Sequence, residues 1–129
     1  MKRHEREELE KNLSYYEELF HEMWKIEASI VGELTLELIF KVCIKRILPV
    51  FSFLEDMIVS SKGISFDKLR QNVNKLSPHD LKNGFQDLIY ELYTCFSILW
   101  GETIIENLPV ELKKLDRMFA HRDKIKKDF

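Results

Sequence analysis

The stretch LSPHDLKNGFQDLIYELYTCFSILW, Leu76 to Trp100, decides the fold class of this chain. Ser77 stands where a helix N-cap is expected, Pro78 at the first helical position and Asp80 at the third, a combination typical of a helix start. The apolar residues that follow recur at alternating spacings of four and three: Leu81, Phe85, Leu88, Leu92, Cys95 and Leu99. This near-heptad pattern predicts one long helix over about residues 78–108, packed at a shallow angle against its neighbours.

The first half of the chain also has the periodicity of helices. An amphipathic helix is predicted over residues 4–29, and a second run, over 32–59, is apolar around more than half of its circumference. Pro49 removes one backbone hydrogen bond and predicts a kink or break near Leu48. The pattern leaves open whether the two helices separate at Gly32 or form one bent rod.

The remaining segments complete an all-α prediction. The clearest loop is SSKG, residues 60–63, and the short helix after it can be capped by Ser65. A last, basic helix is predicted near the C-terminus, and the sequence has no alternating strand pattern and no internal repeat. We therefore predict one helical-bundle domain over residues 1–129, with four to five helices and no sheet.

Composition and charge narrow the class of protein. Of the 129 residues, 45% are apolar and 33% charged, with only four Gly and three Pro, as in a folded domain with few turns. The longest stretch without a charge is ten residues, Leu92 to Gly101, well below the roughly 18 needed for a membrane span. The charged N-terminal segment is unlike a secretory signal, so we expect a soluble, cytoplasmic protein.

One short motif points to a metal. The stretch EELFHEMW, Glu17 to Trp24, contains Glu18 and His21 in the Glu-x-x-His spacing that di-iron helical bundles use. On a helical wheel, however, the pair points away from the apolar arc around Phe20, and the chain has no second Glu-x-x-His. We therefore predict a solvated helix face here, with no metal and no cofactor.

The sequence also lacks the motifs of common enzymes. It has no glycine-rich phosphate loop and no nucleophile elbow. Cys43 and Cys95 each lie inside an apolar helical run, where a free thiol usually behaves as a small core hydrophobe. Neither has a C-x-x-C partner or a neighbouring histidine, so zinc binding and thiol redox chemistry are not expected. We expect a protein that is not an enzyme.

Three acids fall on or near helix faces that should be apolar. Glu27 lies on the core arc of the first helix, and Glu102 and Glu106 lie beside the seam of the long helix. Because a buried carboxylate is costly, each should be paired, protonated, or at an interface, unless it reaches water near a helix end. We favour the last interpretation. The candidate partners are Arg46, Arg70 and Arg122.

Two glycines mark a candidate packing surface. Gly84 and Gly101 lie on the same side of the predicted long helix. Glycine inside a helix costs about 1 kcal/mol relative to alanine, so its use twice on one side favours close approach of a neighbouring backbone or a ligand. Chance inclusion explains the pair equally well.

The C-terminal segment is basic. Residues 109–129 contain seven Lys and Arg against four Asp and Glu, a formal charge of +3. Within it DRMFAHRD, residues 116–123, resembles the Arg-x(4 to 6)-His signature of HEPN ribonucleases, with three residues between Arg117 and His121. The resemblance covers eight residues and implies a small helical dimer that acts on RNA. The basic patch would comprise Arg117, His121, Arg122, Lys124, Lys126 and Lys127.

The amount of apolar surface favours self-association. The first two predicted helices are apolar over wider arcs than one layer of contacts needs, and uncovered apolar patches are where proteins associate. We predict an intracellular homodimer that serves as a dimerisation, protein-interaction or regulatory module in signalling, without nucleic acid as a partner. One alternative is an RNA-directed, HEPN-like enzyme or RNA binder. The other is a small-ligand or metal sensor, with a pocket between the second helix and the long helix near Cys43, Tyr93, Trp100 and Glu102.

Overall fold

The structure is a computed structural model that describes residues 3–101, with only the backbone of Trp100. Four α-helices make up most of this part: α1 (Arg3–Val31), α2 (Glu33–Ile47), α3 (Asp67–Asn72) and α4 (Pro78–Trp100). Between them lie two 3-10 turns, η1 (Ser52–Asp56) and η2 (Val73–Lys75), and two strands, β1 (Ile58–Ser60) and β2 (Gly63–Ser65). The predicted all-α class is confirmed, although the expectation of no sheet is wrong by one short hairpin.

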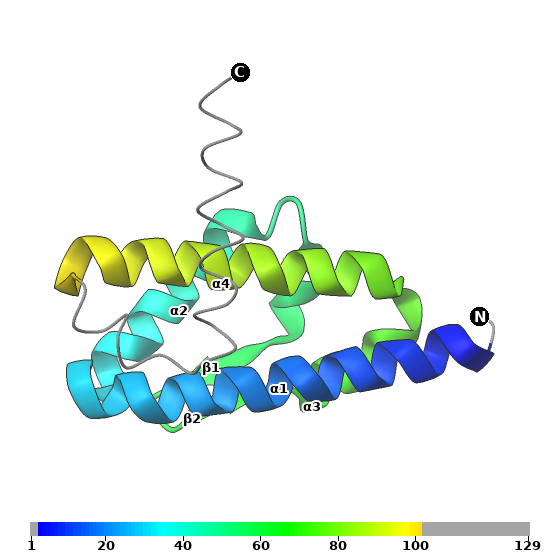
Figure 1. Cartoon of the computed structure of the whole chain (residues 1–129), viewed down its shortest axis with the longest axis horizontal. Coiled ribbons are helices and arrows are strands. Elements are labelled where there is room, and N and C mark those ends of the chain that lie inside the picture. Colours follow the sequence, from blue (N-terminus) through cyan, green and yellow to red (C-terminus); the bar gives the residue numbers. More distant parts are fainter. Residues whose placement is uncertain (1–2, 102–129) are drawn as a thin grey trace, which may run out of the picture.

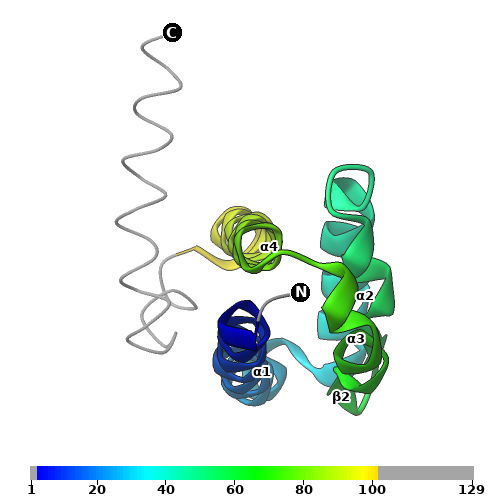
Figure 2. The ribbon, with the colours of Figure 1, turned by 90° about the vertical axis from the view of Figure 1, so that its right-hand side faces the viewer.

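The elements form two layers. Helices α1 and α4 lie side by side and run in the same direction, while α2 runs back across them (Figure 1). Seen from the end, α2, α3 and the hairpin cover one side of the α1–α4 pair (Figure 2). Burying the apolar stripe of each helix against a second layer is what makes such an arrangement stable. Within residues 3–101, no helix has the length and apolar character needed to cross a membrane.

Helices α1 and α2 are separate, which answers the question that the sequence left open. A single residue, Gly32, lies between them with φ 89° and ψ 151°. Its N–H still donates to Ala28 O at 3.0 Å, and its carbonyl accepts from Leu36 N–H at 3.1 Å. Only glycine adopts this positive φ readily, so the chain reverses direction without an intervening loop.

The predicted break near Leu48 is confirmed, because α2 ends at Ile47. The expectation that helix continues to about residue 59 is wrong. Strand β1 instead pairs antiparallel with β2, with Val59 opposite Ile64, and the predicted loop at residues 60–63 is the hairpin turn. Each strand has three residues with only the central one buried, and an alternation this short cannot be told from a helical pattern in the sequence.

The start of α4 follows the prediction, but its end does not. The Ser77 hydroxyl oxygen accepts a hydrogen bond from Asp80 N–H at 3.0 Å, with Pro78 in the first turn. The helix then ends at Trp100 and not near residue 108, because Gly101 takes a φ of 71° that an α-helix does not allow. Residues 102–108 lie outside the described part of the chain.

The core is a single cluster of buried side chains whose centre is aromatic. The ring of Phe85 on α4 has its centroid 5.0 Å from that of Tyr16 and 5.5 Å from those of Phe20 and Phe53. Phe66, immediately before α3, lies 6.3 Å away. These edge-to-face and tilted contacts join α1, η1, α3 and α4 in one layer of rings.

Gly84 provides the space for one of these rings. A Cβ atom at this position would lie 2.5 Å from the ring of Phe53, and the glycine itself is buried. The close approach is thus made by a side chain of the same chain. At Gly101 a Cβ atom would meet no described atom within 4 Å, so the two glycines do not share one close-packed surface with described residues.

We predict that Gly84→Ala lowers the free energy of unfolding by about 1–2 kcal/mol, because overpacking Phe53 outweighs the gain in helix propensity. Urea denaturation followed by circular dichroism measures this change. Lys82→Ala, at an exposed position of the same helix, is the matched control and should change stability by less than about 0.5 kcal/mol. A more stable Gly84→Ala protein would show that Phe53 does not pack on α4.

Candidate interaction surface

The outer side of α2 carries a stripe of exposed aliphatic side chains, which we call the α2 stripe. It consists of Leu34, Leu38 and Val42, which are 74%, 63% and 41% exposed. Their spacing of four residues places them on one side of the helix, one turn apart. The opposite side of the same helix is completely buried and holds Leu36, Phe40 and Cys43. Helix α2 is therefore apolar on two opposite sides, of which only one faces the core.

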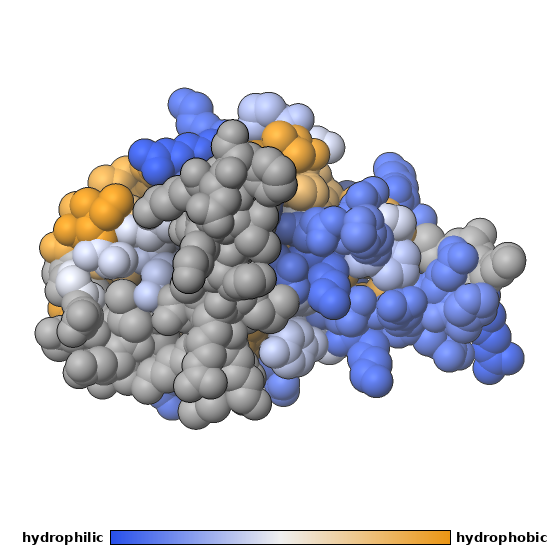
Figure 3. Space-filling model, turned by 45° about the horizontal axis from the view of Figure 1, so that its top comes forward, coloured by the Kyte–Doolittle hydropathy of each residue, from blue (hydrophilic) through white to orange (hydrophobic). Residues whose placement is uncertain are grey.

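The neighbours of α2 determine which side stays outside. Toward α4, Arg46 lies 3.5 Å from Glu91, and Cys43 lies near Cys95. This antiparallel register brings Ile98, which is 77% exposed, level with the part of α2 that carries the stripe. Figure 3 shows apolar side chains gathered at the left-hand end of the molecule, where Figure 1 places the end of α4 and the α1–α2 junction.

The charges of α2 are segregated along its length. Glu33 and Glu37 lie in the first half, and Lys41, Lys45 and Arg46 lie in the second. Within the helix, Lys41 Nζ donates to Glu37 Oε1 at 2.9 Å. The negative half lies at the positive end of the helix dipole and the positive half at its negative end, so the order also stabilises the helix.

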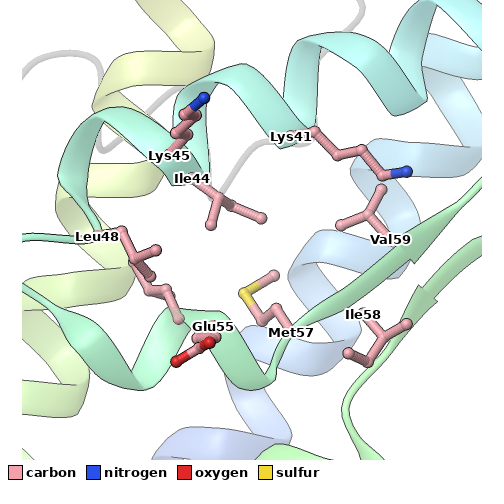
Figure 4. Close-up of a pocket in the computed structure, with 9 residues that line it drawn as sticks. Lys41, Ile44, Lys45, Leu48, Glu55, Met57, Ile58 and Val59 are labelled. Atoms are coloured by element: carbon pink, nitrogen blue, oxygen red, sulfur yellow. The ribbon is translucent and has the colours of Figure 1, made fainter.

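A hollow of about 430 Å³ adjoins the basic half of α2 (Figure 4). Its apolar wall comes from α2 and from the segment around β1, including Ile44, Met57 and Val59. Figure 4 shows Lys41 and Lys45 along α2 and Glu55 on the facing η1 turn. Neither Cys43 nor Tyr93, which the sequence placed beside a sensor pocket, lines this hollow. The other two residues of that expected pocket, the side chain of Trp100 and Glu102, lie outside the described part of the chain.

Glu27 is the one charged residue of the described chain that is completely buried. Neither of its carboxyl oxygens has a hydrogen-bond partner among residues 3–101. Because α1 and α4 are parallel and Phe20 contacts Phe85, Glu27 lies about level with Leu92, inside the apolar core. Burial raises the pKa of Glu27 to about 7, so the carboxyl group is largely protonated below neutral pH.

The favoured expectation for Glu27, that it reaches water at the rim of the core, is therefore wrong. The wheel placed it correctly on the core arc, but α4 runs far enough to cover the end of α1. Its candidate partners within the described residues bind other acids. Arg46 pairs with Glu91, and Arg70 pairs with Glu17 at 3.1 Å.

The Glu-x-x-His pair lies on the outside of α1, as predicted, and both residues are exposed. His21 has a structural contact that the sequence did not indicate: its Nε2 lies 3.1 Å from Ile64 O of β2, and its ring packs edge-on against Phe66. It therefore ties α1 to the hairpin. Across residues 3–101, no group of three or more His, Cys, Asp or Glu is arranged to hold a metal ion.

The other predicted site residues lie outside the described part of the chain. This holds for Glu102 and Glu106, and for the whole basic patch with its HEPN-like segment: Arg117, His121, Arg122, Lys124, Lys126 and Lys127. Conversely, the sequence reasoning missed the α2 stripe. The regular spacing of Leu34, Leu38 and Val42 was a visible signal, but it could not show which side of an apolar helix faces out.

Comparisons with family models, with curated proteins and with solved structures found no match.

We predict that the stability of the protein falls as pH rises from about 4.5 to about 7. Glu27 has an ordinary pKa of 4.5 and a folded-state pKa of about 7, so over this range the unfolded chain releases a proton that the folded chain retains. This difference between the unfolded-state and folded-state pKa corresponds to a loss of about 3 kcal/mol in the free energy of unfolding. Glu27→Gln should remove this loss, so its stability relative to the parent protein should rise by about 2–3 kcal/mol between pH 5 and pH 8.

Urea unfolding at both pH values tests this expectation. Glu18→Gln, at an exposed position on the same helix, is the control and should follow the pH dependence of the parent protein. If Glu27→Gln also kept the pH dependence of the parent protein, the carboxyl group of Glu27 would be ionised and solvated in the folded chain.

Proposed function

We propose that this protein is an intracellular, non-enzymatic interaction module that forms a homodimer through the α2 stripe. The observation that carries the proposal is the combination, on one helix, of three exposed aliphatic side chains in line and a reversal of charge along that line. An exposed apolar row flanked by charged residues is typical of an association surface.

The order of charges favours a second copy of the same chain as the partner. In a two-fold symmetric dimer both copies use the same surface. If that surface is the α2 stripe, the two α2 helices lie antiparallel, and the first half of one helix lies beside the second half of the other. Leu38 of one copy then lies opposite Leu38 of the other, and Leu34 opposite Val42. Glu37 of one copy lies beside Lys41 of its partner. A parallel pairing would instead place like charges together, which is unfavourable.

The available apolar surface sets the expected strength of the dimer. Full burial of an aliphatic side chain contributes about 1.5–3 kcal/mol, and a symmetric pair buries six such chains from the stripe. Association costs about 4–15 kcal/mol in lost freedom of motion. Because the two quantities are similar, the stripe alone gives a weak dimer, so we expect association to appear only at high protein concentration.

We predict that Leu38→Glu shifts the dimer to monomer by weakening association at least about 100-fold, since it places two carboxylates at the symmetry axis. Light scattering over a concentration series measures the shift, from twice the chain mass to 15.5 kDa. Val50→Glu is the matched control, because Val50 is 76% exposed but lies beyond the end of α2. It should leave association unchanged.

Two further results would overturn the proposal. One is a parent protein that stays at 15.5 kDa at high concentration. The other is a dimer that Leu38→Glu and Val50→Glu affect equally. A charge exchange makes the test of orientation stricter: Lys41→Glu should weaken the dimer, and the added change Glu37→Lys should restore it. Failure of the restoration would exclude the antiparallel arrangement of the two α2 helices.

A further inference from the structure

The fold brings the two cysteines of the chain together, although 52 positions separate Cys43 and Cys95 in the sequence. Cys43 lies on the inner side of α2 and Cys95 lies in the second half of α4. The two side chains lie close to each other, near enough for Cys95 to add to the effect of burial on the pKa of Cys43. Both are present as free thiols.

The packing of the two helices supports this proximity independently. One turn from the cysteines, Arg46 on α2 and Glu91 on α4 form an ion pair at 3.5 Å. Residues three positions after Cys43 and four positions before Cys95 therefore also meet, as expected for one antiparallel register between the helices. The two cysteines therefore lie at matching levels of one helix–helix interface, whose register the Arg46–Glu91 pair sets.

The two thiols differ in their access to solvent. Cys43 is fully buried, whereas Cys95 is partly exposed. Burial raises the pKa of Cys43 to about 12, with the nearby Cys95 and Glu91 as smaller contributions. A dissolved oxidant therefore reaches Cys95 first, and Cys43 lies behind it as the second thiol.

We propose that Cys43 and Cys95 form an oxidation site, at which a peroxide or a small-molecule disulfide converts the thiol pair to an intramolecular disulfide between α2 and α4. This site is independent of the proposed dimer, because Cys43 lies on the side of α2 opposite to the stripe. It also changes the expectation from sequence that both cysteines serve only as core hydrophobes.

With hydrogen peroxide, the reaction has two steps. The Cys95 thiolate attacks one peroxide oxygen, so that an S–O bond forms, the O–O bond breaks and the released hydroxide takes up a proton as water. The Cys43 sulfur then attacks the sulfur of the Cys95 sulfenic acid. The S–S bond forms, the S–O bond breaks, and the thiol proton of Cys43 leaves with the oxygen as a second water. Two thiols are oxidised and one peroxide is reduced.

The first experiment treats the full-length protein with hydrogen peroxide and, separately, with oxidised glutathione, and then maps disulfides by mass spectrometry of a non-reduced digest. We expect one cross-linked peptide pair containing Cys43 and Cys95 within a single chain. Because the bond closes a loop of about 50 residues, the melting temperature should rise by roughly 5–10 °C and return to its original value with dithiothreitol.

Single variants separate the roles of the two thiols. In Cys43→Ser, the Cys95 sulfenic acid should accumulate and be trapped by dimedone, and oxidised glutathione should give a stable mixed disulfide. In Cys95→Ser, Cys43 should resist both reagents while the protein stays folded.

Three results would overturn the proposal. They are retention of both thiols after oxidation of the parent protein, a disulfide found only between two chains, and dimedone trapping that is equal in the parent protein and in Cys43→Ser. Because the chain mass by light scattering is measured separately, failure of this proposal is distinguishable from failure of the dimer.

Discussion

The structure depends on the packing of aromatic rings around Phe20 and Phe85. Phe20 contacts Phe40 of α2 and Phe66 as well as Phe85, with ring centroids 5.5–6.3 Å apart. Elements from both halves of the described chain therefore meet at one point. Each such ring pair contributes about 0.5–1.5 kcal/mol to stability beyond the burial of apolar area. Loss of a ring would also leave a void in a closely packed interior. The same packing requires Gly84, because only a residue without a Cβ atom leaves room for the ring of Phe53 beside α4.

This cluster determines the position of α2 and hence which surfaces are available for function. Helix α2 contributes Phe40 to the cluster. Because Gly32 is the single residue between α1 and α2, the start of α2 is held close to the end of α1. With α4 on one flank and the β1 segment on the other, the side of α2 opposite Phe40 faces away from the core. The α2 stripe is thus a consequence of the core. A second layer of contacts for α2 would have to come from outside residues 3–101.

Local features of the fold could be predicted from the sequence, and features that depend on distant contacts could not. Ser77 and Pro78 act within one helical turn, so the start of α4 can be recognised from residues that are neighbours in the sequence. The hairpin was missed because a pair such as Val59 and Ile64 gives no periodic signal in three-residue strands. The proximity of Cys43 to Cys95 follows from the register of two helices, which neither helix encodes alone.

The apolar pattern of α2 shows how the same sequence signal can have two physical origins. A helix that is apolar around more than half of its circumference is expected to be largely buried, and that was the simplest interpretation of residues 32–59. A helix buried on all sides, however, has no place for five charged residues, nor any reason to order them as Glu33 and Glu37 before Lys41, Lys45 and Arg46. The structure separates the two contributions: one apolar side packs on the rings, and the other lies in the open between segregated charges. Charge order along a helix, read together with apolar spacing, therefore distinguishes an exposed apolar surface from a core surface where hydrophobicity alone does not.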